Sequence, residues 1–214
     1  MGWYVFATVG NSDLALEGRS VAQVAQDEKR TFLEYTRELW EAGPARYRQV
    51  SFPLLGPILD HLTAALPQGE AIHDVALVAT RQASPTAAQD TVYAARILAE
   101  LALERYRVRL RRKPQVHVME GVNPALYDEA LGWFRRHLPP LREEGLRVLL
   151  CPTGGTPAMS MGLVLAGLER YREACQLLYV PRGGRVVEVP FARDVLATLR
   201  RERLEQALEG HAYA

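Results

Sequence analysis

The chain has 214 residues, of which 48% are hydrophobic and 24% are charged, and its net charge is +1. Such a chain can bury a sizeable core, which excludes a disordered protein, and it has no overall positive field to collect a long nucleic acid. It contains no apolar run as long as the roughly 18 residues of a membrane span, and its N-terminus lacks the basic region of a secretory signal. We therefore expect a cytoplasmic protein that binds neither long nucleic acid nor membrane.

The predicted strands are short apolar runs, each closed by a turn-forming segment. Residues 3–9 (WYVFATV) are almost continuously apolar, which is typical of a strand buried on both faces. In chain order the predicted strands are residues 3–9, 75–80, 116–119, 147–151 and 177–180, with an antiparallel hairpin partner at 185–189. The helices predicted in the second half of the chain are residues 86–107, 125–137, 157–171 and 194–208.

The stretch between the first two predicted strands is too long for a simple crossover. It contains a polar helical part at residues 21–40 and an apolar part at 52–66, which Pro53 and Pro57 interrupt. We interpret these two parts as an inserted helix and the true crossover helix.

Strands that alternate with helices of this length predict an α/β fold. We expect a Rossmann-like, doubly wound, mainly parallel sheet with a C-terminal β-hairpin and a terminal helix. The domain is expected over residues 1–191, with the helical insertion at about 14–73, and the C-terminal helix over 192–214.

Ligands of open parallel sheets bind at the carboxyl ends of the strands, near the point where the strand order reverses. Four loops rich in small or polar residues are predicted at that edge, namely residues 8–13, 81–85, 120–123 and 153–156. Their convergence predicts one ligand site built from all four loops.

The fourth loop, Thr-Gly-Gly-Thr-Pro-Ala-Met at residues 153–159, is the sharpest motif. Its glycines allow the backbone to approach a ligand closely, and Pro157 suits the first position of a helix. The N-terminus of that helix offers N–H groups and a partial positive charge, to which two threonine hydroxyls add hydrogen bonds. The motif predicts a phosphate cradle. The alternative is a tight turn that needs glycine for packing alone.

Other motifs of nucleotide-binding proteins and hydrolases are missing from the sequence. There is neither a G-x-G-x-x-G fingerprint nor a P-loop, and the only lysines, Lys29 and Lys113, are far from the glycine-rich loops. Ser160 lacks the first glycine of a nucleophile elbow and falls inside the predicted helix.

The cysteines and histidines of the chain predict no metal site. Cys151 and Cys175 are expected to be small core residues, and His61 and His117 have no partnered ligand spacing. His73 and His137 are expected at the surface. We expect no metal and no cofactor.

The predicted helix at residues 157–168 is almost wholly apolar apart from Ser160. A helix that is apolar all round is buried. Either the chain itself or a second subunit covers it, and the sequence leaves both arrangements open.

The first-strand loop, Ala-Thr-Val-Gly-Asn-Ser-Asp at residues 7–13, together with the motif at 153–159, resembles the CRISPR-associated Rossmann-fold (CARF) family. The resemblance extends over roughly residues 1–191. Members of that family bind cyclic oligoadenylates, the second messengers of type III CRISPR antiviral defence, across the two-fold axis of a homodimer. Some members cleave the messenger and are called ring nucleases. This chain departs from many of them at Pro157, where they have lysine.

The resemblance implies a set of ligand-binding residues in the four loops. They are Thr8, Gly10, Asn11, Ser12 and Asp13 in the first loop, Arg81, Gln82 and Ser84 in the second, Glu120 and Asn123 in the third, and Thr153, Gly154, Gly155, Thr156 and Met159 in the fourth. In a ring nuclease, Ser12, Thr153 and Thr156 would stabilise charge on the phosphoryl oxygens.

The function that the resemblance implies is binding of a cyclic oligoadenylate, cyclic tetra-adenylate above all, by a homodimer. We expect metal-independent cleavage by attack of a ribose 2′-OH on the adjacent phosphodiester. Two alternatives remain open at this point. One is a sensor module that binds without cleaving and recruits a separate effector protein, and the other is an unrelated nucleotide-binding enzyme on a Rossmann-like sheet.

Overall fold

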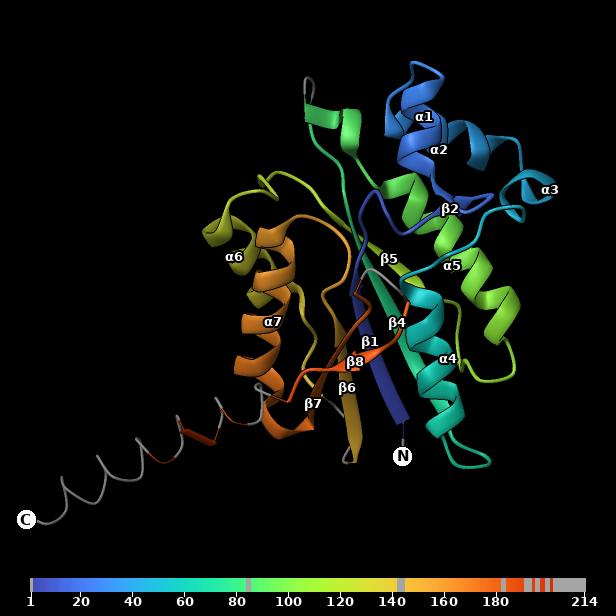
Figure 1. The fold of residues 1–214 in the computed structure, drawn as a ribbon. Helices are drawn as coiled ribbons and strands as arrows, with labels where there is room; N and C mark the ends of the chain where they lie inside the picture. Colours follow the sequence, from blue (N-terminus) through green and yellow to red (C-terminus); the bar gives the residue numbers. More distant parts are fainter. Residues whose placement is uncertain are drawn as a thin grey trace, which may run out of the picture.

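The computed structural model describes residues 2–83, 86–141, 145–181 and 184–190, together with Asp194, Ala197, Thr198 and Arg201. Most of the predicted C-terminal helix and the expected boundary at residue 191 lie outside these residues. A six-stranded sheet forms the centre of the described fold (Figure 1). Its strands are β1 (Gly2–Thr8), β4 (Ala71–Thr80), β5 (Gln115–Met119), β6 (Leu146–Cys151), β7 (Cys175–Tyr179) and β8 (Val187–Glu188).

The strand order is β5-β4-β1-β6-β7-β8. Neighbouring strands from β5 to β7 are parallel, and β8 adds an antiparallel edge against β7. The chain moves from β1 outward to β4 and β5, and then crosses back to β6 on the other side of β1. This reversal confirms the predicted doubly wound, Rossmann-like fold and creates a switch point between β1 and β6.

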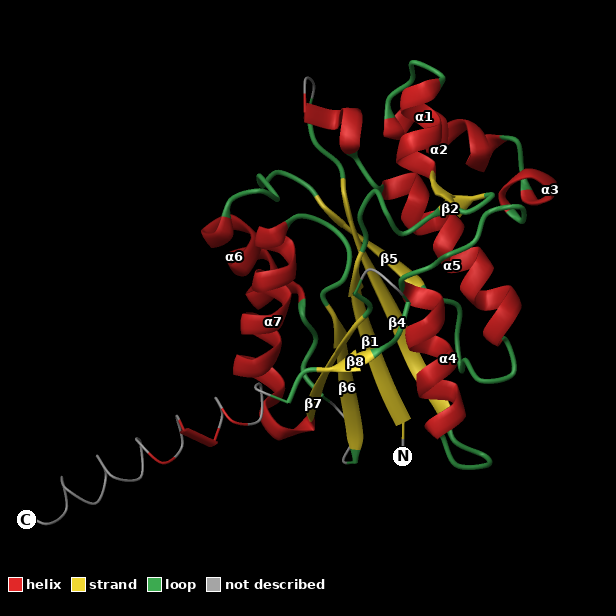
Figure 2. Ribbon diagram, viewed as in Figure 1, coloured by secondary structure: helices red, strands yellow, loops and turns green. Residues whose placement is uncertain are grey.

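Helices cover both faces of the sheet (Figure 2). On one face α4 (Leu55–Ala65) and α5 (Val92–Tyr106) pack against alternate residues of β1, Val5 and Ala7. On the other face α6 (Tyr127–His137) and α7 (Pro157–Tyr171) pack against Phe6. Because successive strand residues point to opposite faces, β1 must be apolar throughout, as the sequence predicted.

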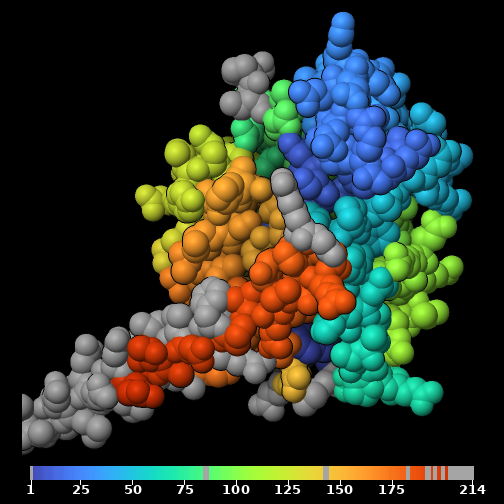
Figure 3. Space-filling model, viewed as in Figure 1, coloured from blue at the N-terminus to red at the C-terminus, as the bar shows by residue number. Residues whose placement is uncertain are grey.

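The insertion after β1 contains more elements than predicted. They are β2 (Ala15–Leu16), β3 (Arg19–Ser20), α1 (Val21–Asp27), α2 (Phe32–Glu41) and α3 (Pro44–Tyr47). The single helix expected over 21–40 is wrong, because Ser20 and Thr31 each begin a separate helix with a capping box. Between them Lys29 has a φ of 58°, which no helix accommodates. In the space-filling view this segment, in blue, forms a block at the top of the molecule (Figure 3).

The predicted helix over 86–107 is also divided in two. A short 3₁₀ helix, η1 (Thr86–Gln89), precedes α5. The break falls at Asp90 and Thr91, whose side chains accept hydrogen bonds from the backbone N–H groups of Gln82 and Thr80 instead of continuing the helix.

Residue-level predictions have mixed outcomes. Cys151 and Cys175 are buried, as predicted, and His137 is exposed. The prediction for His73 is wrong: β4 begins at Ala71, so His73 is a buried strand residue whose ring lies 4.9 Å from that of Tyr4.

The chain itself covers most of α7. Gly162 lets α7 approach α6 closely, since a Cβ there would lie 3.1 Å from a ring carbon of Phe134. A short 3₁₀ turn, η2 (Arg172–Ala174), then leads into β7. Met161 and Leu165 remain 48% and 42% exposed. None of the helices in the described ranges has the length and apolarity that crossing a bilayer requires.

Candidate functional site

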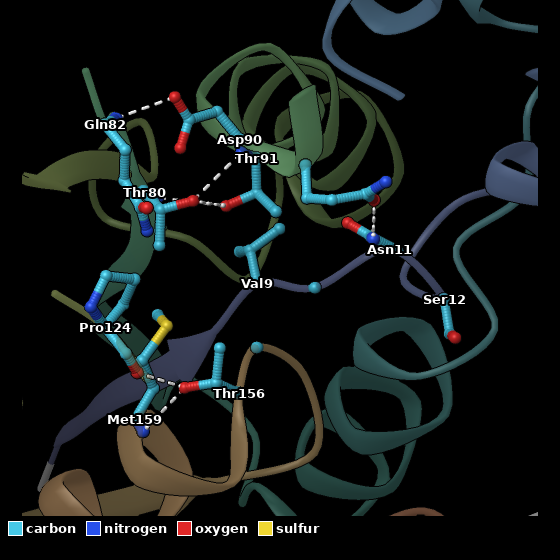
Figure 4. A pocket seen from close by; sticks show the side chains of 13 residues that line it. Val9, Asn11, Ser12, Thr80, Gln82, Asp90, Thr91, Pro124, Thr156 and Met159 are labelled. Carbon is cyan, nitrogen blue, oxygen red and sulfur yellow. Dashed lines mark hydrogen bonds between the residues drawn. The ribbon is translucent and has the colours of Figure 1, made fainter. Parts of the chain in front are cut away.

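A cavity of about 260 Å³ opens at the carboxyl ends of β1, β4 and β6, at the switch point of the sheet. Figure 4 shows Thr80, Asp90 and Thr91 together on one side of it and Thr156 on another, whereas the Ser12 hydroxyl points away from both groups. The lining residues are Val9, Gly10, Asn11, Ser12, Thr80, Gln82, Gln89, Asp90, Thr91, Pro124, Gly155, Thr156 and Met159.

Two glycines bring the β1 and β6 loops into direct contact. A Cβ on Gly10 would lie 2.3 Å from the backbone N of Gly155, and a Cβ on Gly154 would lie 2.4 Å from the carbonyl oxygen of Thr8. The Thr8 hydroxyl donates a 2.6 Å hydrogen bond to the carbonyl oxygen of Gly154. Here the glycines serve the packing of two loops, and the cavity opens above that contact.

Asp13 lies beneath the first loop and does not line the cavity. Its side chain is 3% exposed and accepts a 2.6 Å hydrogen bond from the backbone N–H of Gly10. Burial raises the pKa of Asp13 to about 7, and the Gly10 hydrogen bond opposes that shift. The carboxyl group therefore fixes the shape of the loop that presents Asn11 and Ser12.

The N-terminus of α7 already has a cap of its own. Thr156 Oγ1 accepts a 3.1 Å hydrogen bond from the N–H of Met159 and donates to the carbonyl oxygen of Pro124. Pro157 has no N–H. The N–H groups left for a phosphate at the cavity are those of Gly155 and Thr156, since both residues line it and their N–H groups have no hydrogen-bond partner among the described residues.

One wall of the cavity comes from residues that the sequence analysis missed. Thr80 and Thr91 bond reciprocally, each hydroxyl accepting the other's backbone N–H, at 3.0 and 3.2 Å. Asp90 accepts the N–H of Gln82 at 2.7 Å. The sequence signal was a polar Asp-Thr pair directly before an apolar helical run, which is typical of a helix start.

Asp90 is the one titratable residue among the described residues that line the cavity. It is 2% exposed, and burial raises its pKa, while the N–H of Gln82 and the Thr80 hydroxyl oppose that shift. The remaining polar lining is neutral. Asn11 Nδ2 donates to Gln89 Oε1 across the cavity rim.

The cavity therefore brings together seven of the predicted ligand-binding residues, which are Gly10, Asn11, Ser12, Gln82, Gly155, Thr156 and Met159. Thr8, Asp13 and Gly154 are buried behind it. The Thr153 hydroxyl is buried without a hydrogen-bond partner and does not line the cavity.

The other predicted residues lie outside the lining. Arg81 and Glu120 pair with each other at 2.8 Å. Asn123 accepts the N–H of Ala125 at 3.0 Å, while the neighbouring Pro124 reaches the cavity. Ser84 lies outside the described residues. Within the described part of the chain no cluster of His, Cys, Asp or Glu could hold a metal ion.

The fold resembles that of "Enterococcus italicus Csm6 bound to cyclic hexa-2'-fluoro-hexa-dAMP", one of 23 chains in solved structures that match. The TM-score is 0.57 at 13% sequence identity, and the match covers 100% of this chain and 47% of the Csm6 chain. The likeness shows a shared fold, and this chain spans about half the length of that Csm6. No protein-family model and no curated protein matches the sequence.

Proposed function

We propose that the chain is a CARF-like module that binds a cyclic oligoadenylate in the cavity at the carboxyl ends of β1, β4 and β6. The observation that carries the proposal is the position of this cavity at the switch point of a sheet whose fold matches that of a Csm6 solved with a cyclic hexanucleotide analogue. The fold also agrees with the family resemblance of the first and fourth loops.

The chemistry of the lining supports a nucleotide ligand. The amide groups of Asn11 and Gln82 match the paired donor and acceptor that adenine presents at N6 and N7. The N–H groups of Gly155 and Thr156, at the N-terminus of the 15-residue helix α7, suit a phosphate oxygen. A phosphodiester is thus held by N–H groups and a helix dipole rather than by a cationic side chain.

The size of the cavity supports a shared ligand. Its volume of about 260 Å³ lies just below the roughly 300–1,000 Å³ of small-molecule sites, so one cavity accommodates about one nucleotide unit. A ring of four or six units needs more than one such cavity. A homodimer with its two cavities facing a two-fold axis supplies them symmetrically.

We extend the proposal to slow cleavage of the bound ring. The ribose 2′-oxygen attacks the adjacent phosphorus, so a P–O2′ bond forms while the P–O5′ bond breaks. The Asp90 carboxylate takes the proton of the 2′-OH, and the leaving 5′-oxygen takes a proton from water. The N–H groups of Gly155 and Thr156 stabilise the phosphoryl oxygens. The product is a linear oligoadenylate with a 2′,3′-cyclic phosphate.

The test combines calorimetric binding with product analysis on labelled cyclic tetra- and hexa-adenylate, in EDTA. We expect the wild type to bind and cleave, and Asp90→Asn to bind while cleaving at least about 100-fold more slowly. Asp128→Asn, an exposed carboxylate at the start of α6, serves as the matched control and should behave as the wild type. Absence of binding by the wild type would contradict the proposed function.

A sensor module without cleavage is the second candidate. The chain spans about half of the Csm6 that it resembles, which leaves room in such proteins for a separate effector part. Tight binding of a ring that stays intact after hours at enzyme excess would favour the sensor over the ring nuclease.

A further inference from the structure

A second cavity, of about 610 Å³, lies beside the first, between the insertion and η1. Its polar lining consists of Gln23, Gln26, Lys29, Arg30, Thr31 and Gln89. The insertion that forms it contributes no strand to the central sheet. Figure 1 shows α1 and α2 next to η1 at the end of the molecule where the strands lead into the ligand-binding loops.

The side chains of this second cavity carry unused positive charge. Arg30 is paired with Glu38 and Glu28, whereas Lys29 makes no ion pair in the described part of the chain. The other lysine of the chain, Lys113, is bonded to Glu100. No acidic residue lines the second cavity. An anionic ligand therefore meets a free ammonium group here.

The amide groups offer hydrogen bonds of the kind that a nucleobase uses. The side chain of Gln26 has no hydrogen-bond partner among the described residues. Gln23 uses its carbonyl oxygen for the N–H of Ser20, and Gln89 uses its own for Asn11, so each keeps an NH₂ group. Amide side chains pair with the N6 and N7 edge of adenine.

The two cavities are neighbours that share the side chain of Gln89. This residue lines both, and its bond to Asn11 lies on the border between them. A ligand larger than one nucleotide that extends past this bond from the first cavity meets the lining of the second one.

We propose that the second cavity is a further subsite for the same ligand, holding an adenylate unit by the amides of Gln26 and Gln89 and its phosphate by Lys29. The inference rests on the proposed function. The first cavity holds about one nucleotide unit, and the second cavity would bind a further unit of the same oligoadenylate. It assigns the insertion a role in binding affinity.

The experiment compares Lys29→Asn, Gln26→Ala and the control Lys113→Gln in calorimetric titrations with cyclic tetra- and hexa-adenylate at several salt concentrations. Asparagine tolerates the positive φ of Lys29, so this variant removes the charge and keeps the turn. We expect Lys29→Asn to bind the preferred ring about tenfold more weakly, with a salt slope smaller by about 1.4, since a dimer loses two lysines per ring. Gln26→Ala should weaken binding severalfold with an unchanged slope, and Lys113→Gln should change neither.

Three results would overturn the inference. If Lys29→Asn bound the ring with wild-type affinity and salt dependence, the second subsite would be disproved, whereas binding in the first cavity would remain supported. An equal loss in Lys113→Gln would show a general charge effect. Absence of ring binding by the wild type would overturn the proposed function together with this inference.

Discussion

Asp13 is the residue whose environment differs most from that of an ordinary surface carboxylate. It is buried, its pKa is raised from 3.8 to about 7, and it bonds to the loop that carries Asn11 and Ser12. A raised pKa means that the folded state keeps a proton that the unfolded state releases between about pH 4 and pH 7. This contribution to stability is therefore complete below about pH 4 and is lost as the pH rises to about 7.

We expect the free energy of unfolding of the wild type to fall by about 2–3 kcal/mol between pH 5 and pH 8 through this residue. The melting temperature should fall by roughly 4–12 °C. Asp13→Asn, which keeps an oxygen to accept the Gly10 N–H, should flatten that dependence when both proteins are melted by calorimetry across the pH range. Asp128→Asn should retain the wild-type slope, and a parallel decline in all three proteins would contradict the assignment to Asp13.

The sequence predicted which residues lie in the loops at the cavity better than it predicted what each of these residues does. The glycines of the first and fourth loops were located correctly because their spacing follows buried strands. The role of Asp13 beneath the cavity depends on a contact with Gly154, which is distant in sequence. Thr153 and Thr156 were both expected to face a ligand. In the structure the Thr156 hydroxyl bonds to the carbonyl oxygen of Pro124 and the Thr153 hydroxyl is buried, and both outcomes depend on how α7 packs on the neighbouring loop.

The junction between η1 and α5 is the element that shapes one wall of the cavity. Thr91 Oγ1 accepts the N–H of Thr80 at 3.0 Å, and both residues are buried. Thr91→Val keeps the shape of the side chain but leaves a buried N–H of Thr80 without a partner. We expect a loss of about 1–3 kcal/mol in the free energy of unfolding, measured by urea denaturation. Ring affinity should fall as well, because Asp90 and Gln82 belong to the same wall.

Thr63→Val provides the matched control for that experiment. The Thr63 hydroxyl donates only to carbonyl groups of its own helix, Leu59 at 2.7 Å and Asp60 at 3.1 Å. Its loss exposes no buried donor, so stability and ring affinity should stay close to wild type. Equal effects of the two substitutions would show that the η1–α5 junction has no special role.

At the scale of elements, hydrophobic periodicity predicted the sheet and the helices that pack on it. The strands bury both faces and α7 packs over its whole length, so their patterns are strong. Elements set by side-chain hydrogen bonds were missed. The division of residues 21–40 into α1 and α2 follows from the capping boxes at Ser20 and Thr31, and the start of α5 follows from the Thr80–Thr91 pair. Local hydrogen bonds of this kind hardly change the hydrophobicity pattern of the sequence, so that pattern does not predict them.

The described part of the molecule combines a cavity of about 260 Å³ with an apolar strip of four exposed side chains on the neighbouring helices α6 and α7. Met161 and Leu165 lie one turn apart on α7, and Leu126 and Tyr127 at the start of α6 are 49% and 58% exposed. Exposed apolar groups that gather near a ligand site are typical of an interface. Both helices begin close to the cavity, since Pro124 and Thr156 line it and are joined by a hydrogen bond. The proposed homodimer would bury this strip and bring two cavities to one ring.

We expect the wild type to sediment as a dimer that binds one ring per two chains. The double substitution Met161→Glu and Leu165→Glu should give a monomer and weaken ring binding at least about tenfold, since charged groups would be desolvated in the interface. Val108→Glu is the matched control, because Val108 is 91% exposed just beyond the far end of α5. Analytical ultracentrifugation and calorimetry measure both effects. A wild-type monomer that binds a ring tightly would contradict the proposed homodimer. A double variant that remains a dimer would show that the strip does not form the interface, because charged side chains buried in an interface would prevent it from forming.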